Sequence, residues 1–251
     1  MAMRCPGQDL RFWKPEDIFE APCPACGSAV EFWKDEPWRK CRSCGGRVAN
    51  PRFNLGCAAW CRFAEQCLGR ETMAALQKSL GESILRAMKE TFGQDQRRIH
   101  HALAVLGHAE EVLAEEGGDP LVVRAAAILH DIGIQEAERK HGSAAPKYQE
   151  LEGPPIARRI LERLGVDAGR IEHIVRIVGS HHSAGDLDTD EFRIVWDADR
   201  LANWAEECPA DGPAAARRYV EKAFRTEAGR RLASARLQRE AHAAARPKPE
   251  R

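Results

Sequence analysis

Apolar side chains recur at helical spacing over most of the chain. Between residues 71 and 92 they fall three and four positions apart, which places them on one face of an amphipathic helix ending at Gly93. Further helical patterns follow near residues 95–116, 120–131, 154–164, 167–179, 189–206 and 211–240, separated by glycine and proline residues. No segment alternates with period two for long. The pattern therefore predicts a mainly α-helical protein.

The first 69 residues differ from this pattern. They are rich in Cys, Pro, Gly and Trp and show no helical periodicity. So short a segment buries too little apolar surface to offset the entropy of ordering it, and bound metal is the usual stabiliser of such a module inside a cell. We predict a cysteine-rich metal-binding module over 1–69, a connecting helix over 70–94, an all-helical domain over 95–240 and a disordered tail over 241–251.

Composition narrows the class of protein. The 251 residues include 38 basic and 38 acidic side chains, so no net charge draws the chain toward nucleic acid or an anionic membrane. The N-terminus lacks a signal-peptide pattern, and the longest apolar run, residues 125–129, is far too short to span a bilayer. Eight of the nine cysteines fall in clusters within residues 1–67, so we expect a cytoplasmic protein in which these clusters bind metal or do redox chemistry instead of forming disulfides.

Four cysteines have the spacing of a structural zinc site. Cys23 and Cys26 form one CxxC turn, and Cys41 and Cys44 form a second one after fourteen intervening residues. Two such turns supply four thiolates, which close a tetrahedral zinc site with no open position for catalysis. The spacing is similar to that of zinc ribbons, so we expect short β-strands around a structural zinc ion.

The other N-terminal cysteines leave several interpretations open. Cys57, Cys61 and Cys67 lie four and six positions apart, and three thiolates lack a fourth ligand. Cys5 is nearby in sequence, and Cys208 or a histidine could serve from further away. An iron–sulfur cluster, a second zinc ion and free thiols are the alternatives.

The same module contains side chains suited to contact with a partner. Two tryptophans, Trp33 and Trp38, accompany the basic residues Arg39, Lys40, Arg42 and Arg47. Such residues bind either proteins or nucleic acid. We expect the module chiefly to stabilise its own fold. If it also binds a partner, the neutral chain favours a protein over nucleic acid.

The helical domain contains a histidine–aspartate pair in an apolar setting. His130 and Asp131 follow the apolar run from Val122 to Leu129. Burying two ionisable groups there is costly unless they are paired or bind a metal. The pair therefore requires polar partners from elsewhere in the chain.

Further histidines and aspartates occur around this pair in a characteristic order. His101 lies upstream with Val105 four positions later, and Asp199 lies downstream, followed by Arg-Leu. The order His, His-Asp, Asp-Arg-Leu resembles the HD superfamily of phosphohydrolases over about residues 95–235. The resemblance implies a metal site whose ligands are His101 (ahead of its neighbour His100), His130, Asp131 and Asp199 (ahead of Asp197).

Many members of this superfamily hold a second metal, bridged by the aspartate of the pair. The resemblance makes His141, His181 and His182 candidate ligands of that ion. Glu152 stands where relatives place a histidine before a helix, so it either replaces that ligand or only favours the helix N-terminus electrostatically. Whether the site holds one metal or two stays open.

The ligand types limit the metal and its chemistry. Imidazole and carboxylate groups suit Mn, Fe, Co, Ni, Zn or Mg better than a soft ion. A divalent ion lowers the pKa of water and shields phosphate oxygens from the attacking nucleophile. We expect Asp131 to orient that water, with His130 beside it as the other catalytic residue of the pair. Candidate phosphate-binding residues are Lys140, Lys147 and either Arg97 or Arg98.

The resemblance predicts a metal-dependent phosphohydrolase that cleaves a phosphoester or phosphoanhydride of a small, nucleotide-like substrate. Two alternatives remain. Some relatives use a di-iron site for oxygenase chemistry, which would show as iron content and O₂-dependent turnover without phosphate release. A regulatory or scaffold protein would use the pocket for binding only, although the intact ligand set argues against this.

Overall fold

The computed structural model describes residues 13–34, 36, 38–51 and 70–244. The chain divides into two compact units, Met1–Cys61 and Arg62–Arg251. Cys5, Cys57, Cys61 and Cys67 lie outside the described residues, and so does the predicted boundary at residue 69.

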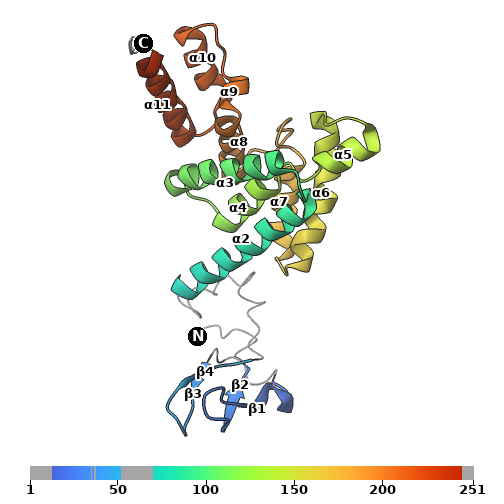
Figure 1. Cartoon of the computed structure of the whole chain (residues 1–251), viewed down its shortest axis with the longest axis vertical. Helices are drawn as coiled ribbons and strands as arrows, with labels where there is room; N and C mark the ends of the chain where they lie inside the picture. Colours follow the sequence, from blue (N-terminus) through green and yellow to red (C-terminus); the bar gives the residue numbers. More distant parts are fainter. Residues whose placement is uncertain (1–12, 35, 37, 52–69, 245–251) are drawn as a thin grey trace, which may run out of the picture. The chain divides into compact units, whose positions relative to one another are not determined.

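The N-terminal unit consists of two small antiparallel hairpins that follow the 3-10 helix η2 (Pro15–Asp17). Strand β1 (Ile18–Pro22) pairs with β2 (Ala29–Trp33), and β3 (Trp38–Lys40) pairs with β4 (Arg47–Ala49) (Figure 1). Val30 and Phe32 alternate inward along β2 and pack with Val48, Cys23 and Cys41. The prediction of short strands around a cysteine cluster is confirmed, and the apolar core of this unit is small.

The second unit is helical, as predicted. Its elements are α2 (Arg70–Phe92), α3 (Gln96–Glu116), α4 (Pro120–Leu129), α5 (Ile134–His141), α6 (Pro146–Arg163), α7 (Ala168–Val178), α8 (Asp190–Ala202), α9 (Trp204–Glu207), α10 (Pro213–Ala223) and α11 (Glu227–Ala244). Side chains of Asp95, Asp119, Asp167 and Thr189 cap α3, α4, α7 and α8 by accepting backbone N–H groups. Among the described residues, no helix is long and apolar enough to cross a membrane.

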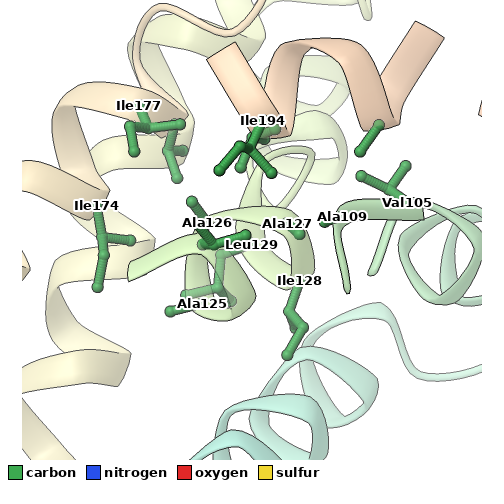
Figure 2. Packing of buried hydrophobic residues seen from close by; sticks show 14 of the residues in the cluster. Val105, Ala109, Ala125, Ala126, Ala127, Ile128, Leu129, Ile174, Ile177 and Ile194 are labelled. Carbon is green, nitrogen blue, oxygen red and sulfur yellow. The ribbon is translucent and has the colours of Figure 1, made fainter. Parts of the chain in front are cut away.

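Helix α4 lies at the centre of the core. Every residue from Leu121 to Leu129 except Arg124 is buried, and α4 contacts α2, α3, α7 and α8. Figure 2 shows its alanine-rich segment with Ile174 and Ile177 of α7 on one side and Ile194 of α8 above it. Because α4 is covered on all sides except around Arg124, the residues at its C-terminal end lie in the interior of the unit.

Helices α5 and α6 differ from the sequence-based expectation. Helix α5 was not predicted, because only Ile134 and Ala137 of its residues are buried and no apolar stripe marks it. Helix α6 begins at Pro146 instead of near residue 154, and it continues through Pro154 and Pro155. Two prolines remove two helical N–H donors, yet packing against α5 and α7 keeps the segment helical.

The last two predicted helices are each interrupted. The segment predicted over 189–206 breaks at Asn203, and the segment predicted over 211–240 breaks between α10 and α11. Helix α11 extends to Ala244, past the predicted start of the tail, and residues 245–251 lie outside the described residues.

Candidate metal centres

Two buried histidines lie just after α4 and α7, and each bonds the carbonyl of the residue three positions earlier. His130 Nδ1 hydrogen-bonds Ala127 O at 2.8 Å, and His181 Nδ1 hydrogen-bonds Val178 O at 2.7 Å. Each ring is thereby fixed with its Nε2 atom facing inward. His181 Nε2 is buried and has no hydrogen-bond partner among the described residues. A buried polar atom without a hydrogen-bond partner lowers the stability of the fold unless a bound ligand or ion interacts with it.

The first group of ligands, called site A, consists of His101, His130, Asp131 and Asp199. His101 Nε2 lies 3.2 Å from His130 Nε2, 3.1 Å from Asp199 Oδ1 and 3.7 Å from Asp131 Oδ2. His130 Nε2 lies 3.4 Å from Asp131 Oδ2 and 3.6 Å from Asp199 Oδ1. Donor atoms around one ion, with bonds of about 2.1 Å, are separated by about 3.0–3.4 Å along octahedral or tetrahedral edges. The donors of site A fit a single divalent cation.

The second group, called site B, shares Asp131 with site A. Asp131 Oδ1 lies 3.5 Å from His181 Nε2, and donor atoms of Asp131, His181 and His182 all lie within 4.8 Å of one another. Asp131 thus presents one carboxylate oxygen to each group. The arrangement fits two ions bridged by one aspartate.

The electrostatics favour cation binding. Burial lowers the pKa of His130, but the carboxylates of Asp131 and Asp199 outweigh this effect and raise it to about 9. Burial raises the pKa of both aspartates, yet the surrounding histidines hold them below their usual value. His182 differs, because burial and the nearby His181 lower its pKa to about 4. Ionised carboxylates and a neutral His182 are the forms that bind metals, while a cation at site A competes with the proton of His130.

Sequence reasoning missed two residues of α6 that face site B. Gln149 Oε1 lies 3.3 Å from His182 Nε2. The carboxylate of Glu150 accepts hydrogen bonds from the backbone N–H groups of His182 and Ser183, at 3.0 and 2.8 Å. No motif marks these residues; only the packing of α6 against α7 brings them to the turn.

The structure groups the other candidate residues elsewhere. His141 and Lys140 hydrogen-bond the buried Glu152 at 2.9 and 2.6 Å, and they are absent from the metal-ligand groups found among the described residues. Glu152 lies inside α6, so its expected place before a helix was wrong. The Nζ of Lys147 lies over the ring of Tyr148.

The two arginine candidates also have partners. Arg98 pairs with Asp95 and Glu138, and Arg97 Nη2 lies 3.9 Å from Glu206 Oε1. His100, the neighbour of His101, is exposed. Of the predicted metal ligands, the structure brings together those of sites A and B, which are His101, His130, Asp131, His181, His182 and Asp199.

The cysteine cluster of the N-terminal unit forms a separate centre. Cys23 Sγ lies 3.7 Å from Cys44 Sγ, and Cys26 Sγ lies 3.6 Å from Cys41 Sγ. Four sulfurs around zinc at 2.3 Å are about 3.8 Å apart. The two CxxC turns share the same backbone hydrogen bond: the N–H of Gly27 donates to Cys23 O, and the N–H of Gly45 donates to Cys41 O. The four cysteines could hold a metal ion in a closed site.

Hydrogen bonds prepare these thiols for a metal. Bonds from Ser28 lower the pKa of the Cys26 thiol to about 6. Backbone N–H groups of Cys44 and Ser43 lower that of Cys41. The backbone N–H of Gly46 lowers the pKa of Cys44, but the three neighbouring sulfurs outweigh it and raise that pKa to about 11. Thiolates are the metal-binding form of cysteine, so the surroundings favour the charged form at Cys26 and Cys41 and disfavour it at Cys44.

Comparison with known proteins agrees with this geometry. Residues 98–204 match the HD domain family model. A predicted HD superfamily hydrolase from an uncultured Thermotogales bacterium is 24% identical with a TM-score of 0.50, covering 65% of this chain and 88% of that one. An HD-superfamily hydrolase from Bacillus thuringiensis is 19% identical with a TM-score of 0.47, covering 67% and 94%. No curated protein matches in sequence. The likeness to an HD domain thus covers residues 98–204, which include His101, His130, Asp131, His181, His182 and Asp199.

Proposed function

We propose that this protein is a metal-dependent hydrolase that cleaves a phosphoester or phosphoanhydride of a small, nucleotide-like substrate. The observation behind the proposal is the division of the Asp131 carboxylate between two groups of donors. Its Oδ2 lies 3.4 Å from His130 Nε2, while its Oδ1 lies 3.5 Å from His181 Nε2. A pair of ions held in this way suits an in-line displacement at phosphorus. The HD domain supports the reaction class, and the nucleotide-like substrate is an extension from the resemblance.

The proposed roles of the site residues follow from how far each side chain is buried. Divalent ions, when bound, lower the pKa of water and neutralise phosphate charge. The side chain of His130 is 1% exposed, so it holds its ligand atom in place from within the core. The side chains of His101 and Asp131 are 22% and 14% exposed and mark the side from which a substrate approaches. In this proposal Asp131 both holds metal and orients the attacking water.

The test is metal-dependent phosphate release. Protein stripped with a chelator is reloaded separately with Mn²⁺, Fe²⁺, Co²⁺, Ni²⁺, Zn²⁺ or Mg²⁺ and incubated with a panel of nucleotides and phosphomonoesters, and inorganic phosphate is measured. We expect release with at least one ion, and its loss to near background in Asp131→Asn. Glu138→Gln, an exposed carboxylate of α5 that pairs with Arg98, serves as the matched control and should retain activity.

Two results would contradict the proposal. One is the absence of phosphate release with every ion and substrate of the panel. The other is undiminished turnover by Asp131→Asn in a sample whose metal content has been measured. O₂ consumption by the iron-loaded protein without phosphate release would favour the oxygenase alternative instead.

A further inference from the structure

Both polar atoms of the Gln149 side-chain amide have a partner. The residue is 7% exposed. Its Nε2 donates a hydrogen bond to Ala144 O at 2.6 Å, and its Oε1 lies 3.3 Å from His182 Nε2. Because a flip of the amide would break the bond to Ala144, the oxygen stays directed at the His182 ring. A buried amide oxygen therefore faces one of the three residues of site B.

The turn that presents His182 is held from the same helix. Glu150, next to Gln149, accepts the backbone N–H groups of His182 and Ser183. Ala184 follows with a φ of 62°, the sole positive value at a non-glycine position in the described part of the chain. Such a backbone persists only when its surroundings enforce it. Glu150 therefore holds the backbone of His182, and the preceding residue, Gln149, contacts the His182 ring.

We infer that Gln149 Oε1 is a protein ligand of site B, and that its lack of charge makes site B the weaker of the two metal sites. The inference rests on the proposed two-ion centre. Site A has the carboxylates of Asp131 and Asp199. Site B shares Asp131 and otherwise has the neutral donors His181, His182 and Gln149. Because affinity for a divalent ion rises with the number of charged ligands, site A fills first and site B fills at a higher ion concentration.

The experiment follows Mn²⁺ binding to the metal-stripped full-length protein, without substrate. Isothermal titration calorimetry gives the affinity of each step, and electron paramagnetic resonance reports the exchange-coupled signal that appears only when two Mn²⁺ ions are close together. We expect two steps that differ by about 10-fold or more, with the coupled signal appearing during the second.

Variants of Gln149 assign the second step. Gln149→Leu should weaken it by about 10-fold or more, while Gln149→Glu, which adds a carboxylate, should strengthen it. Both should keep the first step, which verifies that the fold and site A are intact. Gln135→Leu is the matched control, since the Gln135 amide also donates to a backbone carbonyl, that of Phe92 at 3.2 Å, and its loss should change neither step.

Equal second steps in the wild type and in both Gln149 variants would overturn the inference, and so would a single step in the wild type. These measurements do not involve phosphate release. Failure of the proposed function would instead appear as two normal binding steps without turnover, so the two failures are distinguishable.

Discussion

Two aspartates of α8, two positions apart, have different surroundings and different roles. Asp199 Oδ1 lies 3.1 Å from His101 Nε2 and accepts a hydrogen bond from Asn203 at 3.0 Å. Asp197 is 0% exposed and accepts hydrogen bonds from the N–H of Arg225, the N–H of Thr226 and the Thr226 hydroxyl. Asp199 therefore faces the other donor atoms of site A, whereas Asp197 organises the turn that begins α11.

Asp197→Ala should lower stability without removing metal ligands. The substitution leaves two buried N–H groups and a hydroxyl without an acceptor, which costs about 2–4 kcal/mol. Urea unfolding in the presence of a chelator measures this cost, and Mn²⁺ titration of the folded variant should still show the first binding step. Asp199→Ala is the paired control and should show the opposite pattern. Loss of the first step in Asp197→Ala with unchanged stability would contradict the assignment.

The sequence was informative about single residues where a motif contains them. The resemblance to the HD motif implied His101 ahead of His100, and the structure places His101 beside His130 and His100 at the surface. Gln149 and Glu150 could not be found in this way. Their relation to His182 depends on the contact between α6 and the turn after α7, which lies more than thirty residues further along the chain. Local patterns do not encode such a contact.

At the scale of elements, the contact between α5 and α6 shapes the site. It depends on Gly133, because a Cβ there would lie 2.4 Å from the backbone N of Gly153. Gly133 follows the metal-binding pair within two residues, and Gly153 precedes the two prolines of α6. The Gly-Pro-Pro segment predicts a break between helices, since local propensity disfavours a helix there. The close backbone approach that overrides this preference is a tertiary effect.

Gly133→Ala should therefore destabilise the helical unit by about 1–3 kcal/mol, because neither backbone can move away without disturbing its helix. The φ of Gly133 is −82°, so backbone strain does not contribute. Gly107→Ala in α3 is the matched control. Nothing lies within 4 Å of its added Cβ, so the alanine should stabilise α3 by about 0.5–1 kcal/mol. Chemical denaturation of both variants measures the difference. A Gly133→Ala protein as stable as Gly107→Ala would show that α5 and α6 separate freely.

At the scale of the whole molecule, the two units reach stability by different means. The helical unit surrounds α4 with apolar side chains from four other helices. The N-terminal unit has a much smaller cluster around Phe32, and two cysteines are part of that cluster. Composition alone predicted this contrast, because a cysteine-rich segment without apolar periodicity cannot rely on a hydrophobic core.

Cys23→Ser should consequently release one zinc ion per chain and unfold the N-terminal unit while the helical unit stays folded. Zinc in such a module supplies folding free energy directly, and Cys23 is 2% exposed, so its loss also affects the core. Elemental analysis measures the zinc, and hydrogen–deuterium exchange resolved by peptide should show lost protection within residues 18–49 alone. Cys208→Ser, outside the cluster, should leave the protection of residues 18–49 unchanged. Unchanged zinc content in Cys23→Ser would refute the structural zinc site, and lost protection in α3 or α4 would show that the stability of the helical unit depends on the zinc module.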